Sequence, residues 1–161
     1  MLSTEGVAPA AVAAAVEEVV RERLAARPAL PGWEPGSVAV LATGAGAPHA
    51  IPISTALRAG PRAIVLGLAH RRETLARLRE DPRCAFTLLA AGDVAFTAHG
   101  HATVLDDVAE GVAAVRIDVT AIQEHGTDRF DIDAGVAWHW TDPEAERRDA
   151  AVRNALARLA G

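Results

Sequence analysis

The sequence contains no lysine, no tyrosine and only one cysteine, Cys84. The absence of lysine excludes a Schiff-base amine and a phosphate-binding P-loop, and the absence of tyrosine excludes a phenolic acid. A single cysteine excludes a disulfide within the chain and a CxxC zinc or redox motif, and its apolar neighbours in RCAFTLL predict an unreactive strand residue. Any anion site must therefore consist of arginine side chains, hydroxyl groups and backbone amides.

Long apolar runs and an excess of positive charge are absent as well. No run approaches the ~20 apolar residues of a membrane-spanning helix, and the first residues lack the basic start of a secretory signal. With a formal net charge of -5, the chain offers no broad positive surface for nucleic acid. We therefore expect one soluble, cytoplasmic domain over residues 1–161, with neither a membrane nor a nucleic-acid partner.

Helical patterns occur at both ends of the sequence. Residues 9–26 place valines at helical spacing between charged residues, and residues 143–160 do the same after Thr141 or Asp142 as N-cap and Pro143 in the first turn. A short helix is predicted within residues 70–82. Seven strands are predicted from period-two patterns, at residues 37–43, 51–58, 62–69, 84–90, 94–105, 112–124 and 135–140. This order favours a mostly antiparallel barrel over residues 36–141 with helices outside it.

The segment LATGAGAPHAIPIS contains two glycines where a nucleotide-binding loop would have them. A dinucleotide loop needs a third glycine and a helix, but here His49 takes the third position and Pro48 begins an alternating strand. The pattern instead predicts a hairpin in which Gly44 and Gly46 supply positive φ angles. Pro52 lies inside the next strand, which predicts a sheet edge or a bulge where a ligand can approach the backbone.

A basic cluster, HRRETLAR, follows the predicted strand 62–69. Arginine side chains, a threonine hydroxyl and free amides at a helix start can together bind a phosphate. The same residues can form a solvated helix in which Glu73 pairs with Arg77. Spacing alone does not decide between these two interpretations.

Two pairs of aromatic residues share strand faces. His99 and His101 point to the same side, but no third ligand follows from the spacing, so a metal site is not predicted. Trp138 and Trp140 also share a face, which favours core or interface aromatics over a flavin stack.

The order of these motifs resembles the FMN-binding split barrel of the pyridoxamine 5'-phosphate oxidase superfamily. The resemblance rests on VAVLATGAGAPHAIPIS, on AIVLGLAHRRETLARLREDPRCAFTLL and on a strand ending in HGHATVL. It covers residues 36–105 well and continues more loosely to the tryptophans, and both terminal helices lie outside it. It implies a mainly β (α+β) fold, a six- to seven-stranded antiparallel split β-barrel with flanking helices, and a homodimer with FMN between the subunits.

The resemblance also implies roles for particular residues. The flavin ring would lie along Ile51, Pro52, Ile53, Ser54, Leu66, Gly67 and Leu68. The phosphate would be bound by Arg71, Arg72, Thr74 and Arg77, and Trp138 or Trp140 of the partner subunit would close the pocket.

Some positions depart from the family pattern. Relatives carry lysine at the position of Thr74 and asparagine at that of Arg77, and the oxidases of pyridoxamine phosphate have basic residues where this chain has Ile51 and Ala56. The C-terminal arginine and proline signature of those oxidases is replaced by AWHWTDPEA. We therefore expect an FMN-dependent oxidoreductase of another substrate rather than a pyridoxamine phosphate oxidase.

Two alternatives use the same scaffold. One is a split barrel that binds a deazaflavin cofactor or haem, with His70, His99 or His101 as the haem ligand. The other is a non-enzymatic dimer with weak or no cofactor binding, since a phosphate clamp without lysine can be weak.

Overall fold

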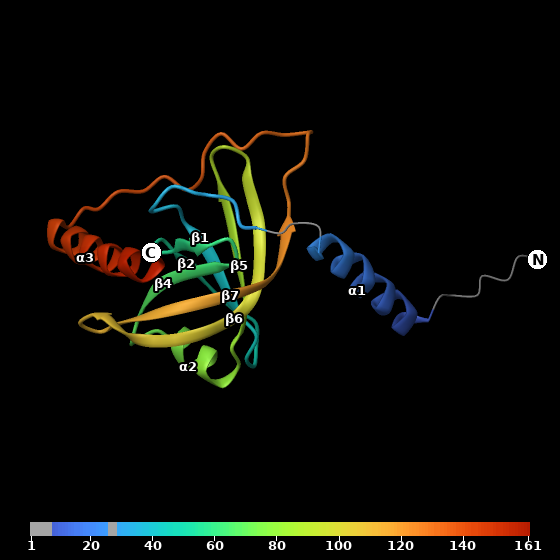
Figure 1. Cartoon of the computed structure of the whole chain (residues 1–161), viewed down its shortest axis with the longest axis horizontal. Coiled ribbons are helices and arrows are strands. Elements are labelled where there is room, and N and C mark those ends of the chain that lie inside the picture. Colours follow the sequence, from blue (N-terminus) through green and yellow to red (C-terminus); the bar gives the residue numbers. More distant parts are fainter. Residues whose placement is uncertain (1–7, 26–28) are drawn as a thin grey trace, which may run out of the picture.

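The computed structural model describes residues 8–25 and 29–161, with only the backbone of residues 19–25 (Figure 1). Its helices are α1 (Pro9–Ala25), α2 (Glu73–Glu80) and α3 (Pro143–Ala160). Its strands are β1 (Ala39–Thr43), β2 (His49–Ile53), β3 (Leu57–Gly60), β4 (Ala63–Ala69), β5 (Arg83–Ala90), β6 (Val94–Ala109) and β7 (Val112–Glu124). The fold is therefore mainly β with flanking helices, as predicted.

The strands form one antiparallel sheet in the order β2-β1-β5-β6-β7-β4-β3. β2 and β3 follow each other in the chain but lie at opposite edges of this sheet, so the sheet must curl until its edges approach. Residues 54–56 connect the two edges. The result is a barrel with an open seam between β2 and β4, which fits the predicted split barrel.

The inside of the barrel holds an aromatic cluster of Trp33, Phe86 and Phe96. Trp33 lies 5.8 Å from each phenylalanine, measured between ring centroids, and its Nε1 donates to the carbonyl of Ala56 at 3.2 Å. Both phenylalanine side chains are completely buried. Burial of each contributes on the order of 2–3 kcal/mol, so the long connection before β1 is tied to the core through Trp33.

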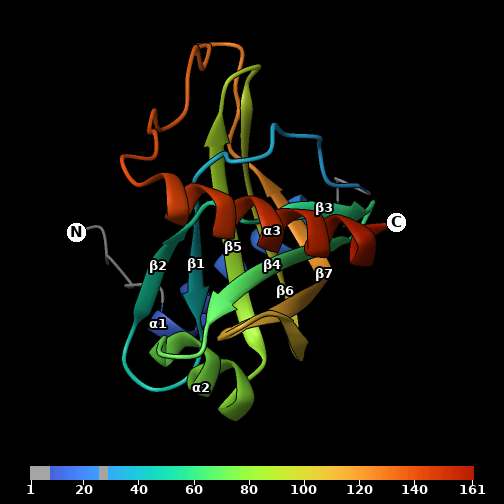
Figure 2. The ribbon, with the colours of Figure 1, turned by 90° about the vertical axis from the view of Figure 1, so that its left-hand side faces the viewer.

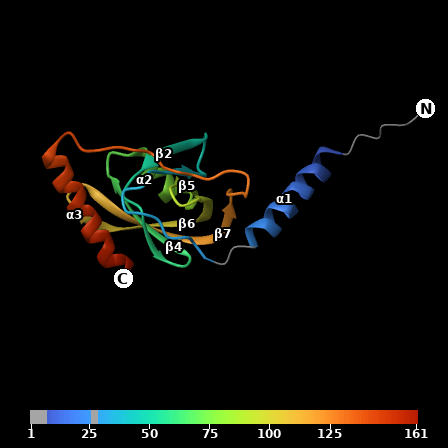
Figure 3. The ribbon, with the colours of Figure 1, turned by 90° about the horizontal axis from the view of Figure 1, so that it is seen from above.

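The three helices differ in how they meet the barrel. α3 lies across β3 and β4 (Figure 2), with Val152 and Leu156 packed on Val65 and Ala114. The side chain of Asp142 accepts from the amide of Glu144, as expected for its N-cap. α2 buries its apolar side against the bottom of the barrel. α1 projects away from the barrel on the side opposite α3 (Figures 1 and 3).

Two strand predictions were wrong. Residues 135–140 form no strand, because no strand among the described residues pairs with them. The predicted strand 51–58 is two strands, β2 and β3, broken where the chain crosses the seam. Residue 26, the predicted end of the first helix, lies outside the described residues.

The hairpin prediction was correct for one of its glycines. Gly46 has a φ of +63°, whereas Gly44 does not have a positive φ. Gly44 is needed for a close approach instead, since a Cβ there would lie 3.2 Å from Oδ2 of Asp81.

In the described part of the chain, no helix combines the length and apolarity that crossing a membrane requires.

Candidate functional site

A groove of about 150 Å³ lies at the seam where the two edges of the sheet approach. One wall comes from β2 and the crossing after it, and the other from the end of β4 and the turn before α2. We call it the seam groove, and it is lined by Ile51, Pro52, Ile53, Ser54, Thr55, Gly67, Leu68, Ala69, Arg71 and Arg72. The structure thus brings residues 51–54 together with Gly67, Leu68, Arg71 and Arg72 of the residues that were predicted to meet a flavin.

The β2 wall is an edge strand. Pro52 pairs with Val40 of β1 on one side, and on the other side β2 has no strand partner among the described residues. A proline, which has no N–H to donate, is tolerated at such an edge. The prediction of an edge position for Pro52 is confirmed, and the free side of β2 faces the seam groove.

Thr55 holds the seam together. Its Oγ1 lies 3.1 Å from both the amide nitrogen and the carbonyl oxygen of Gly67, accepting from the first and donating to the second. The sequence did not indicate this residue, because the break between β2 and β3 depends on contact with β4 and not on a local signal. The width of the seam groove is therefore determined in part by one hydroxyl group.

Arg71 and Arg72 form the positive end of the seam groove. Both side chains are exposed, and within the ranges 8–25 and 29–161 neither guanidinium has an ion pair or a hydrogen-bond partner. Arg72 is the N-cap of α2 and makes no side-chain cap, so the amides of Glu73 and Thr74 have no acceptor within those ranges. The unpaired cations and the free amides together suit an anion.

Thr74 and Arg77 lie outside the seam groove. Thr74 is completely buried, and its Oγ1 bonds to Nε2 of His49 at 3.0 Å. The guanidinium of Arg77 donates to the carbonyls of Ala45 and Ala47, and thus clamps the β1–β2 turn. A phosphate would have to displace these contacts, so the structure favours a positioning role for both side chains.

Three further predicted residues are placed apart from the seam groove. Leu66 is fully buried in the core. Trp138 and Trp140 pack edge to face, with ring centroids 5.2 Å apart, and Nε1 of Trp138 donates to the carbonyl of Gly36 at 3.0 Å. The tryptophans therefore pack on the loop before β1, and their predicted role in a partner's pocket stays a prediction.

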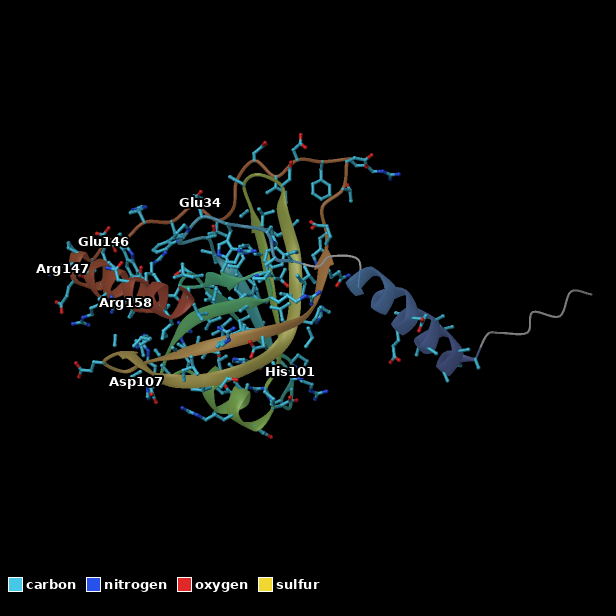
Figure 4. The ribbon with its side chains drawn as sticks, in the orientation of Figure 1. Glu34, His101, Asp107, Glu146, Arg147 and Arg158 are labelled. Carbon is cyan, nitrogen blue, oxygen red and sulfur yellow. The ribbon has the colours of Figure 1, made fainter. Side chains whose placement is uncertain are left out.

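None of the three candidate haem ligands lines the seam groove. His70 is half exposed, with Nε2 2.6 Å from Oδ1 of Asp107. His101 lies toward the α2 end of the barrel and Asp107 beside the β6–β7 hairpin (Figure 4). No group of three or more potential metal ligands occurs among the described residues.

A second cavity, of about 310 Å³, lies over β1, β5 and β6 and includes Cys84 and His99. Burial raises the pKa of the Cys84 thiol to about 12, which agrees with an unreactive cysteine. Nε2 of His99 is buried without a partner. At the rim, hydrogen bonds from Arg83 lower the pKa of Asp81 to about 2, so the two side chains neutralise each other.

No family model matches the sequence, and no curated protein matches it. The chain is similar in structure to several solved proteins at low sequence identity. A provisionally named pyridoxamine 5'-phosphate oxidase from Listeria innocua is 11% identical, with a TM-score of 0.48, over 72% of this chain and 99% of its own.

Two reductases are similar to the same degree. BorF, the flavin reductase component of a bacterial two-component tryptophan halogenase, is 12% identical with a TM-score of 0.49, over 57% of this chain and 81% of its own. An F420 reductase has the same identity and TM-score, over 57% of this chain and 93% of its own. At TM-scores below 0.5, these similarities carry no argument about cofactor or reaction.

Proposed function

We propose that this chain is a flavin-dependent oxidoreductase that binds FMN in the seam groove. The observation that carries the proposal is that an unpaired strand edge and two unpaired guanidinium groups line one groove. A bound flavin would supply hydride or electron transfer, while the protein would supply orientation and hydrogen bonds.

The phosphate would lie at the start of α2. Arg71 and Arg72 can each give charge-assisted hydrogen bonds to its oxygens, and the amides of the first helical turn add two further donors. Glu73, the one acid of this turn, is held by Arg77 at 2.8 Å, and the hydrogen bond from Arg77 lowers its pKa. The negative charge of Glu73 is therefore compensated within the helix and does not oppose a phosphate.

The flavin ring would lie along residues 51–54. The amides and carbonyls on the free side of β2 have no strand partner and can bond to the polar edge of the ring. Ile51 and Pro52 offer apolar surface for its face. Mixed apolar and polar lining of this kind is usual in cofactor sites.

The seam groove is too small for a whole cofactor. Sites for ligands of this size have volumes of roughly 300–1,000 Å³, whereas the seam groove has about 150 Å³. The remaining walls must come from elsewhere, and we propose that they come from a second copy of the chain in a homodimer.

The sheet offers a surface for this second copy beside the seam groove. Strand register and burial place twelve side chains on the outside of β2, β1, β5, β6 and β7. We call this surface the outer face, and it consists of Ala50, Pro52, Val40, Ala42, Ala85, Thr87, Leu89, Ala95, Thr97, His99, Ala121 and Gln123. These twelve residues include no aspartate, glutamate or arginine, and the first charged side chain on the same side of the sheet is Arg83, which pairs with His101 at the end of the outer face nearest α2. An uncharged patch of small side chains is typical of the core of an interface between subunits.

Titration with FMN, followed by quenching of flavin fluorescence, tests the proposal. The wild-type protein is expected to show saturable quenching. Arg72→Ala is expected to weaken FMN binding at least ~10-fold and riboflavin binding less than ~2-fold, because riboflavin lacks the phosphate that the guanidinium would contact. Arg79→Ala, on the same helix but outside the seam groove, is the matched control and should change neither.

The possible results of this titration separate two parts of the proposal. If the wild-type protein gives no saturable quenching, FMN binding is wrong. If Arg72→Ala weakens FMN and riboflavin equally, the phosphate assignment is wrong. An absorption spectrum of protein from its native host separates FMN from the deazaflavin and haem alternatives, because each has its own bands.

A further inference from the structure

The valines at positions 12 and 16 of helix α1 are not covered by another element within the described part of the chain. The side chains of residues 9–18 are all exposed, including Val12 at 49% and Val16 at 56%. Most of the helix stands clear of the barrel in two perpendicular views (Figures 1 and 3). Its main contact with the body of the protein is with β7.

A free helix of this kind needs a surface to cover. α1 has 17 residues. In proteins most of the stability of a helix comes from packing an apolar side against another element. Helical spacing puts Val12 and Val16 on one side and Ala10 and Ala14 on the opposite side.

We propose that α1 is an arm that each copy of the chain lays on the outer face of a second copy. The occupant of the outer face is thus a segment of a second copy of this same chain. The inference rests on the homodimer of the proposed function and adds the element that builds it.

The size of the outer face supports an arm. Stable interfaces involve roughly 20–30 residues on each side, or about 800 Å² per partner. The outer face offers twelve small or medium side chains, of which Ala95 and Thr97 are already buried within the chain. Contact between two such faces therefore falls short of a stable dimer, and an apolar helix from each copy supplies additional buried area.

The position and length of α1 also fit. α1 lies beside β7, which is the border strand of the outer face of its own chain, so the arm starts next to the surface through which two copies would meet. Seventeen residues of helix extend about 25 Å at 1.5 Å per residue. The five strands of the outer face span about 19 Å at 4.8 Å per gap, so an arm can cross all of them.

The exposed part of the outer face is apolar where the arm would arrive. Val40 of β1 is 44% exposed and Leu89 of β5 is 54% exposed. Both side chains lie on the half of the outer face that is farthest from β7 in the strand order. Contact between these residues and the valines of α1 would bury apolar area on both copies.

Sedimentation equilibrium of full-length variants tests the arm. The double variant Val12→Asp/Val16→Asp is expected to raise the dimer dissociation constant at least ~10-fold, because it places two charges on the packed side. The matched control Ala10→Asp/Ala14→Asp adds the same charges on the opposite side and should change the dissociation constant less than ~2-fold. Equal dissociation constants for the two double variants would overturn the arm.

Cross-linking identifies the surface that the arm occupies. Val16→Cys protein is mixed with Val40→Cys protein and treated with a short bismaleimide, and the joined peptides are identified by mass spectrometry. The native Cys84 does not interfere, because it is buried and its pKa is about 12. A covalent pair joining positions 16 and 40 is expected, with a yield at least ~5-fold above that of Ala14→Cys with Val40→Cys. Pairs joining only positions 16 and 16 would overturn the assignment.

The wild-type protein separates this inference from the proposed function. A wild-type protein that binds FMN and remains monomeric overturns the arm and leaves the flavin site standing. A wild-type dimer that shows the cross-link but no FMN binding supports the arm and contradicts the flavin site.

Discussion

The hydroxyl of Thr55 bonds to both backbone groups of Gly67, at 3.1 Å in each case, and joins the two edges of the sheet. It does so at the one place where no strand pairing closes the barrel. The same two residues line the seam groove, so the closure of the barrel and the shape of the candidate site depend on one contact.

Thr55→Val should therefore weaken the fold. The substitution preserves the shape of the side chain and removes the hydroxyl, which leaves two backbone groups of Gly67 without this partner. We expect a loss of about 1–3 kcal/mol in the free energy of unfolding, measured by urea denaturation. Thr103→Val, at an exposed position of β6, is the control and should change it by less than ~0.5 kcal/mol. Equal values for both variants would contradict the role of Thr55.

Gly67→Ala should be destabilising because of space. A Cβ at this position would lie 2.9 Å from Cγ1 of Val152 and 3.2 Å from Cγ1 of Val112. We expect a loss of about 1–3 kcal/mol in the free energy of unfolding, since Val152 is a buried residue of α3 and cannot move freely. In a double-mutant cycle with Val152→Ala, part of this loss should be recovered, and additive effects would show that the clash lies elsewhere.

Arg77→Met separates a structural role from phosphate binding. The guanidinium donates to Ala45 and Ala47, so its loss should lower the free energy of unfolding by about 1–3 kcal/mol. The ratio of FMN to riboflavin affinity should stay within ~2-fold of the wild-type ratio, because the guanidinium lies outside the seam groove. A selective loss of FMN affinity would restore Arg77 to the phosphate site. Arg79→Met is the control for stability.

Asp81 should make the free energy of unfolding depend on pH in the acid range. The hydrogen bonds from Arg83 lower its pKa from 3.8 to about 2 in the folded protein. The unfolded chain therefore takes up this proton first as pH falls, and the contribution of Asp81 is present above pH 3.8 and lost as pH approaches about 2. The difference in unfolding free energy between wild type and Asp81→Asn should shrink across this window. In an Arg83→Gln background the difference should change less with pH across the window, because the side-chain bonds are lost while the backbone amide of residue 83 still donates to Asp81. An unchanged slope there would rule out the Arg83 side chain as the main cause.

Local patterns were sufficient for the elements whose signals lie in adjacent residues. The last helix runs from Pro143 to Ala160 with Asp142 as its cap, as predicted, because capping and helical periodicity are short-range. The edge position of Pro52 followed from its missing N–H. The pair between Glu73 and Arg77 followed from their spacing on one turn.

Long-range contacts decided the rest. The alternation at residues 135–140 is that of a strand, but a strand requires a neighbour, and this chain supplies none there. Residues 51–58 alternate without interruption in the sequence, and only the curled sheet breaks them at the seam. Arg77 and Arg72 are equivalent in charge, yet one is held by the carbonyls of a distant turn and the other is free among the described residues.

The sequence by itself determined the mainly β fold, the helical ends and the chemistry available to an anion site, since composition and periodicity are properties of the chain alone. The tertiary structure decided which arginines remain unpaired, where the two sheet edges meet and which apolar side of α1 is left uncovered. These features depend on contacts between residues twelve or more positions apart, and their proximity arises only when the sheet closes around its core.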